Sequence, residues 1–207
     1  DANRAVELDP SNCRALGARA IVKRLLKDPS GAMADINKAL ALNPLYHQGH
    51  DSRAQLLLEA GDLSGALASS NRAVELSPQT PLYLVRRATI YRNLKNYTAA
   101  ITDLNHAIEI SPKSPDAYFQ RGLVRLEQKR WDDTIADNTK ALELNIPNAS
   151  GAYNNRGLAH KYKGMINEAR RDFTRALEIK PDNSLAKGNL ERLNKLPAGA
   201  ARSPVKQ

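Results

Sequence analysis

Six prolines recur along this chain at an almost constant interval. Their successive spacings are 34, 34, 34, 35 and 34 residues, and one extra residue, assigned to Ile146, accounts for the longer interval. A fixed interval of this length marks a structural unit that is copied along the chain, so the sequence predicts a repeat architecture. The prolines are Pro10, Pro44, Pro78, Pro112, Pro147 and Pro181.

Small side chains recur with the same period, in three columns. They are accompanied by Leu, Ile or Val at spacings of three and four residues, which is the pattern of an apolar helix face. Turn-forming stretches such as residues 27–31 and 60–65 divide each period in two. The proline ends the second half, because a helix does not continue through it. Each period is therefore predicted to contain a helix, a tight turn and a second helix. The columns are Ala20, Ala54, Ala88, Gly122 and Gly157; Ala32, Ala66, Ala100, Thr134 and Ala169; and Ala39, Ala73, Ala107, Ala141 and Ala176.

The composition agrees with closely packed helices. Aromatic residues make up only 5% of the 207 residues, so a core must be built mainly from Ala, Leu, Ile and Val. One helix pair cannot bury its apolar face alone, whereas stacked pairs bury a continuous core. The predicted fold class is all-α.

The repeat pattern resembles the tetratricopeptide repeat family. The resemblance rests on the 34-residue helix pair, on the small residues at the helix crossings and on the closing phrase ALELNIP at residues 141–147, which contains the inserted Ile146. It implies a right-handed α-solenoid of stacked antiparallel helix pairs.

The repeat frame predicts how the chain is divided. Residues 1–10 are expected to be the second helix of a truncated N-terminal repeat. Five repeats follow, at residues 11–44, 45–78, 79–112, 113–147 and 148–181, and the fourth carries the one-residue insertion. Residues 182–196 are expected to form a capping helix with a polar outer face, and residues 197–207 a flexible tail, because the tail has little apolar content.

Charged residues also follow the period. One arginine precedes the small residue of each first helix, and a row of five arginines would suit an acidic partner. The second helices, however, carry a polar column sixteen residues further on, and the two columns face each other in an antiparallel hairpin. We therefore favour intramolecular Arg–Asp pairs in four units, with Ser69 interrupting the series. The columns are Arg19, Arg53, Arg87, Arg121 and Arg156, and Asp35, Ser69, Asp103, Asp137 and Asp172.

The family resemblance also implies a binding surface. In that family the first helices line a concave groove that binds extended peptides or helices of partner proteins. The predicted function is therefore a non-catalytic protein–protein interaction scaffold. The corresponding groove positions are Gln48, Asp51, Gln55, Leu82, Val85, Arg86, Thr89, Arg92, Asp116, Phe119, Leu123, Asn154, Leu158 and Lys161.

Two known ligand classes of the family fit this chain poorly. Members that bind the C-terminal carboxylate of heat-shock chaperones use a set of Lys, Asn and Arg side chains, of which only Arg86 has a counterpart here. The resemblance therefore implies weak binding to a chaperone tail or none. The asparagine ladder of the sugar-transferase members is absent, since only Asn155 stands in that column.

The sequence lacks the common motifs of catalysis and cofactor binding. It contains no phosphate-binding glycine loop, nucleophile elbow or HExxH motif. His47 and His50 have only Asp51 nearby as a further ligand, which is too few for a metal site. We expect no catalytic residues, no metal and no cofactor, and the chain is not predicted to be an enzyme.

The net charge of +9 supports an alternative function, a basic platform for nucleic acid or an anionic surface. The excess lies toward the two ends and forms no dense Lys/Arg block, so nucleic acid is the less favoured partner. A regulatory fragment of a larger enzyme is a further alternative, and homo-oligomer formation is left open. No apolar run approaches the roughly 20 residues of a membrane span. The compartment is not assigned, although a cytoplasmic location is weakly favoured because no signal peptide is visible.

Overall fold

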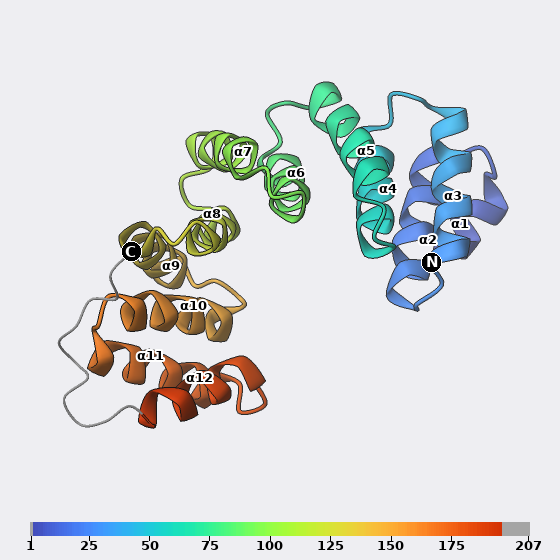
Figure 1. Cartoon of the computed structure of the whole chain (residues 1–207). Helices are drawn as coiled ribbons and strands as arrows, with labels where there is room; N and C mark the ends of the chain where they lie inside the picture. The colour runs from blue at the N-terminus through green and yellow to red at the C-terminus, as the bar shows by residue number, and fades with distance from the viewer. Residues whose placement is uncertain (1, 196–207) are drawn as a thin grey trace. The chain divides into compact units, whose positions relative to one another are not determined.

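The computed structural model describes residues 2–195, and every regular element in that range is an α-helix (Figure 1). The predicted all-α solenoid of helix pairs is confirmed. The predicted tail, residues 197–207, and Leu196 lie outside the described residues. The helices are α1 (Ala2–Leu8), α2 (Cys13–Leu25), α3 (Pro29–Leu42), α4 (His47–Glu59), α5 (Leu63–Leu76), α6 (Pro81–Asn93), α7 (Tyr97–Ile110), α8 (Pro115–Glu127), α9 (Trp131–Glu143), α10 (Ala149–Tyr162), α11 (Ile166–Ile179) and α12 (Ser184–Asn194).

The chain divides within α7 into two compact units, residues 1–103 and residues 104–207. In the first unit α2 packs on α3, and α4 packs on α5, so each pair forms a helix hairpin. The second helix of each hairpin contacts the first helix of the next one, as α3 contacts α4 and α5 contacts α6. The first helices α2 and α4 also touch each other. A core cluster joins Ala20, Ile36 and Leu56 from α2, α3 and α4, so the apolar face of each hairpin is buried by its neighbour.

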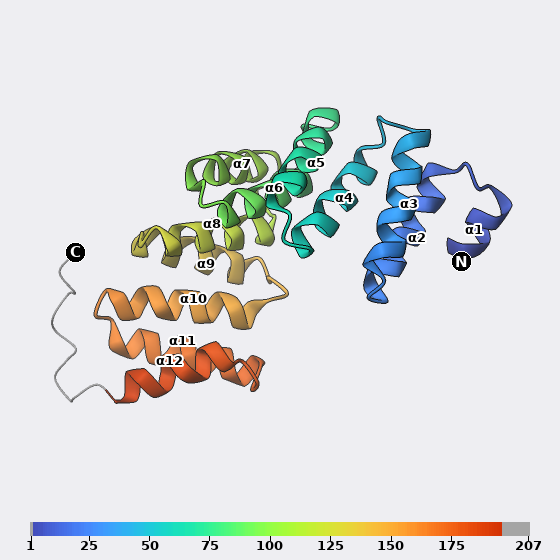
Figure 2. The same ribbon diagram turned by 45° about the vertical axis from the view of Figure 1, so that its right-hand side comes forward.

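The second unit repeats this arrangement. Helix α8 packs on α9, α9 on α10, α10 on α11 and α11 on α12 (Figure 2). The first helices again meet, with α10 contacting both α8 and α12. Phe173 is fully buried in a cluster with Ala169 and Leu193, so α12 covers the apolar face that the last hairpin would otherwise expose.

The small-residue columns allow the helices of one hairpin to approach closely. Ala32, Ala66 and Ala169 are completely buried. At the two glycines of the first-helix column, the facing side chain comes too close to leave room for a Cβ atom. A Cβ atom at Gly157 would lie 2.7 Å from the Phe173 ring, and one at Gly122 would lie 2.6 Å from Asn138 Nδ2.

The turns inside the repeats share one backbone conformation. In each turn, one residue has a positive φ, and the residue after it donates its N–H to a carbonyl five residues back, which is the Schellman ending of a helix. Thus Asp28 N donates to Lys23 O at 2.9 Å and Arg130 N to Arg125 O at 2.8 Å. The left-handed residues of these turns are Lys27, Gly61, Lys95, Lys129 and Gly164.

The inserted residue gives α9 the same kind of ending. Asn145 has φ 59°, and Ile146 N donates to Ala141 O at 3.1 Å. The Ile146 side chain is only 4% exposed and packs with Phe119 and Ala152. The insertion is therefore absorbed in one closing turn, and its side chain becomes part of the core.

Candidate partner-binding surface

The arginine column of the first helices is used inside the repeats. Four of its members bind the aspartate sixteen residues further on, with N–O distances of 2.6 Å for Arg19–Asp35, 2.7 Å for Arg87–Asp103 and Arg156–Asp172, and 2.8 Å for Arg121–Asp137. In the remaining unit Arg53 Nε donates to Ser69 Oγ at 3.0 Å. The hypothesis of four intramolecular pairs is confirmed. Because these four arginines are already paired within the protein, the column does not offer a row of free cations to a partner.

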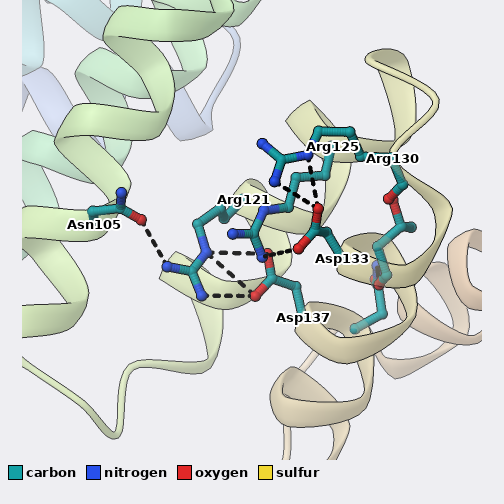
Figure 3. A network of polar contacts seen from close by, with 8 residues as sticks. Asn105, Arg121, Arg125, Arg130, Asp133 and Asp137 are labelled. Atoms are coloured by element: carbon teal, nitrogen blue, oxygen red, sulfur yellow. Dashed lines mark hydrogen bonds and ion pairs between the residues drawn. The ribbon is translucent and has the colours of Figure 1, made fainter.

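Three of these aspartates have a second basic side chain as a partner, which the sequence reasoning missed. Figure 3 shows Asp137 between Arg121 and Arg125, and Arg125 Nη1 donates to Asp137 Oδ2 at 2.7 Å. Lys23 bonds Asp35 in the same way at 2.9 Å, and His160 Nδ1 lies 2.9 Å from Asp172 Oδ2. The signal in the sequence is a basic residue four positions after the column arginine, which places both on one helix face.

The pairing lowers the pKa of two buried carboxyls, Asp35 and Asp172. The hydrogen bond from Arg19, aided by Lys23, lowers the pKa of Asp35 although burial opposes it. Burial acts to raise the pKa of Asp172, but the hydrogen bonds from His160 and Arg156 outweigh it and the pKa is lowered. Both carboxylates therefore stabilise the folded state when they are ionised.

Four of the predicted groove residues come together in the first unit. They line a cavity of about 200 Å³ on α4 and α6. Its walls combine apolar side chains with two carboxylates and one guanidinium group. The lining residues are Asp51, Ala54, Gln55, Leu58, Glu59, Arg86, Thr89 and Ile90.

Half of this lining was not predicted from the sequence. Leu58 and Glu59 follow Gln55 by one helical turn, so extending the predicted face along α4 would have found them. Glu59 is held by Arg24 of α2, whose Nη1 lies 2.6 Å from Glu59 Oε1. Ala54 belongs to the buried small-residue column. Its position in the sequence predicts burial, and its place in the cavity wall is seen only in the structure.

The cavity contains one carboxyl in an unfavourable environment. Asp51 is 5% exposed, and burial raises its pKa even though Arg86 forms an ion pair with it and Gln55 Nε2 donates to it at 3.1 Å. Beside it, burial and the Asp51 charge raise the pKa of Tyr83 to about 12. His47 Nδ1 lies 2.8 Å from the Tyr83 hydroxyl, which forms a second polar contact between α4 and α6.

The other predicted groove residues of this unit do not line the cavity. Gln48 and Leu82 are exposed at the starts of α4 and α6. Val85 is buried, and Arg92 is half-buried near the end of α6. Gln48 and Leu82 are thus accessible at one end of this helix face, and the cavity lies further along it.

In the second unit the predicted residues are mostly packed against other helices. Phe119 is 8% exposed and contacts the core cluster around Ile146, with Leu123 against the same cluster. Asn154 is 4% exposed and accepts a hydrogen bond of 2.8 Å from Asn189 Nδ2 of α12.

The remaining three positions of this unit differ in exposure. Leu158 packs on the Phe173 cluster, and Asp116 is exposed. The Lys161 ammonium lies 5.6 Å from the centre of the Tyr162 ring. Among the predicted groove residues of the second unit, Asp116 and Lys161 are therefore the polar side chains that solvent reaches.

The described part of the chain offers neither a metal-binding cluster nor a membrane span. Among residues 2–195, no group of three or more His, Cys, Asp or Glu side chains is arranged to hold a metal ion. No helix in the same range is both long enough and apolar enough to cross a membrane.

Comparison with known proteins gives family matches and structural neighbours. One family model, described as TPR repeat, matches residues 88–129, and another, described as tetratricopeptide repeat, matches residues 150–183. No curated protein matches the sequence. Many solved structures have the same fold.

Three of these structures illustrate the likeness. YrrB, described as a TPR protein with an unusual peptide-binding site, is 19% identical with a TM-score of 0.68, over 92% of this chain and 97% of that one. The thermophilic TPR protein TTC0263 of Thermus thermophilus is 19% identical with a TM-score of 0.71, over 89% and 100%. A chain of the Cut9–Hcn1 hetero-tetramer of APC/C is 18% identical with a TM-score of 0.85, over 97% of this chain and 40% of that one. Taken with the stacked helix hairpins, these matches identify tetratricopeptide repeats at residues 88–129 and 150–183, in a chain that has the fold of TPR proteins.

Proposed function

We propose that this protein is a non-catalytic interaction scaffold that binds an extended segment of a partner protein on its first helices. The observation that carries the proposal is the cavity on α4 and α6, where Asp51, Gln55, Arg86 and Thr89 lie together beside apolar walls. YrrB, which shares the fold, is described as having a peptide-binding site. That description supports the proposal only through the shared architecture, because the two chains are 19% identical.

The cavity suits one aliphatic side chain of such a segment. Its volume of about 200 Å³ and its apolar walls from Leu58 and Ile90 match a residue of the size of Leu or Met. The polar groups at its rim, Gln55 and Arg86, would bond the main chain of the segment on either side. A chaperone carboxylate is disfavoured further, because Arg86 already forms an ion pair with Asp51.

The test is a selection of random peptides displayed on phage. Peptides enriched on the wild-type protein should share an aliphatic position, and calorimetry should show that they lose most of their affinity for the variant Thr89→Trp. Thr89 borders the cavity and is half-buried, so an indole ring at this position fills the space that the peptide side chain would occupy.

The matched control is Thr102→Trp. Thr102 is an exposed threonine on a second helix, away from the cavity lining. Peptides that bind Thr89→Trp as tightly as the wild type, or that lose affinity only for Thr102→Trp, would overturn the proposal. So would a selection that enriches no peptide at all.

A further inference from the structure

A second hollow lies on α10 and α11, which pack side by side in the second unit (Figure 2). Its volume is about 530 Å³. On α10 it is bordered by Tyr153 and Arg156, which occupy a different helix face from the predicted groove positions Asn154 and Leu158. The hollow is therefore separate from the groove of the proposed function.

Arginine dominates the wall of this hollow. The Arg156 guanidinium group is already paired within the protein, because it donates to Asp172 at 2.7 Å and to Thr139 at 3.1 Å. The other three arginines, all on α11, are exposed, and they are Arg170, Arg171 and Arg175.

The exposed arginines have only weak partners. Arg171 is 75% exposed and lies 3.3 Å from Glu168, three residues before it. Arg175 pairs at 2.7 Å with Glu178, three residues after it, and both side chains are more than half exposed. Surface pairs of this kind contribute little, so both guanidinium groups can exchange their partner for a carboxylate of a ligand. Arg170 donates to Asn194, a neutral partner, at 3.2 Å.

The other repeats show that the fold does not require these arginines. At the positions of Arg170 and Arg171, the preceding second helices carry apolar or small residues, and each of them forms a helix of similar length. The arginine pair is thus a feature of the last repeat alone. The equivalent residues are Met33 and Ala34 in α3, Leu67 and Ala68 in α5, Ile101 and Thr102 in α7, and Ile135 and Ala136 in α9.

We propose that this hollow binds an acidic peptide segment of a partner protein through Arg170, Arg171 and Arg175. A planar guanidinium group binds a carboxylate through two parallel hydrogen bonds, and three such groups on two successive turns of α11 match carboxylates spaced along a segment.

Nucleic acid fits this hollow less well. Glu168 and Glu178 flank the arginines and would repel a continuous run of phosphates. The aromatic ring in the wall, Tyr153, is covered by Arg156 at 5.2 Å, so it does not offer a free face for base stacking.

The experiment measures the fluorescence anisotropy of a fluorescein-labelled oligoglutamate peptide titrated with the protein at about 0.1 M salt, where the Debye length is about 10 Å. The test variant is Arg170→Ile with Arg171→Ala, which installs the residues that α9 carries and therefore preserves the helix. We expect saturable binding by the wild-type protein, weakened about tenfold or more in the test variant. The matched control is Lys113→Ala with Lys187→Ala, which removes the same amount of charge from two exposed positions outside the hollow.

The control variant should keep the wild-type affinity within about twofold, since exposed charges at a distance are screened. Three results would overturn the proposal: no saturable binding of the peptide, equal weakening in both variants, or binding of a labelled oligothymidylate that oligoglutamate does not displace. The last result would favour nucleic acid as the ligand. Circular dichroism of the test variant verifies that a loss of binding is not a loss of folding.

Discussion

Arg87 and Asp103 show how a single residue pair holds one hairpin together. Two hydrogen bonds of 2.8 and 2.7 Å join them, and both side chains are largely buried. The desolvation cost of such a pair offsets most of its attraction, but removing one partner leaves the other buried and unpaired. The pair therefore specifies the hairpin geometry more than it adds stability.

This account predicts strong coupling between the two residues. Arg87→Ala and Asp103→Ala should each lower the free energy of unfolding by roughly 3 kcal/mol, and the double variant should cost little more than either single change. Urea unfolding of the four proteins measures the coupling. The same cycle on Arg53 and Ser69 should give a smaller coupling, because the acceptor of the Arg53 hydrogen bond is the neutral Ser69 hydroxyl. Additive losses at Arg87 and Asp103 would contradict the prediction.

Acid should weaken the pairs in a defined direction. Because the folded-state pKa values of Asp35 and Asp172 are lowered, their stabilising effect is complete above the unfolded-state pKa and is lost as the pH falls through the folded-state values. The stability difference between wild type and Asp172→Asn should therefore shrink between about pH 6 and about pH 3. Urea unfolding at both pH values measures this difference. With the exposed Asp116→Asn as control, a difference that stays constant at Asp172 would refute the assignment.

At the scale of the helical elements, the turns within the repeats contain a backbone conformation that is unfavourable for some of their residues. Lys27, Lys95 and Lys129 adopt positive φ values, where Gly61 and Gly164 stand in the other repeats. A side chain in this conformation places Cβ too close to the following carbonyl oxygen.

Replacing one of these lysines by glycine should stabilise the protein. For Lys129→Gly we expect a gain of about 0.5 to 1 kcal/mol, since relief of the strained conformation exceeds the added freedom of the unfolded chain. The reverse change, Gly61→Lys, should cost a similar amount. Thermal unfolding of the two variants checks both signs, and destabilisation by Lys129→Gly would show that the lysine side chain makes a contact that outweighs the strain.

The sequence predicted these elements well for a physical reason. The backbone geometry requires prolines after the second helices and small side chains at the helix crossings, so their period can be read directly from the sequence. The Arg and Asp columns, sixteen residues apart, can be read in the same way. The cavity on α4 and α6 was only half predicted, because its shape depends on how Leu58 and Ile90 fill the space between the helices. The family resemblance placed Phe119 in the groove, whereas its ring lies in the buried cluster that contains the inserted Ile146.

At the scale of the whole molecule, each of the two units has its contacts mainly between successive helices, so a local defect should stay local. Gly157→Ala places a Cβ atom 2.7 Å from the buried Phe173 ring and should destabilise the protein by about 1 to 3 kcal/mol. Hydrogen exchange should show the loss of protection in α10 and α11 and leave α2 and α3 nearly unchanged.

The control for this prediction is Gly188→Ala in α12. A Cβ atom there meets nothing closer than 3.8 Å, so the change should be neutral or stabilising through the higher helix propensity of alanine. Uniform loss of protection along the whole chain in Gly157→Ala would mean that the array unfolds as one cooperative body.

The closing turn at Asn145 and Ile146 bears on how such arrays change length. A left-handed residue ends the helix, and the apolar residue behind it is taken into the core, so the register of the next hairpin survives an addition to the chain. A one-residue insertion should therefore be tolerated at any of the proline boundaries, in natural or engineered variants, when the inserted side chain is apolar and can be buried in the core.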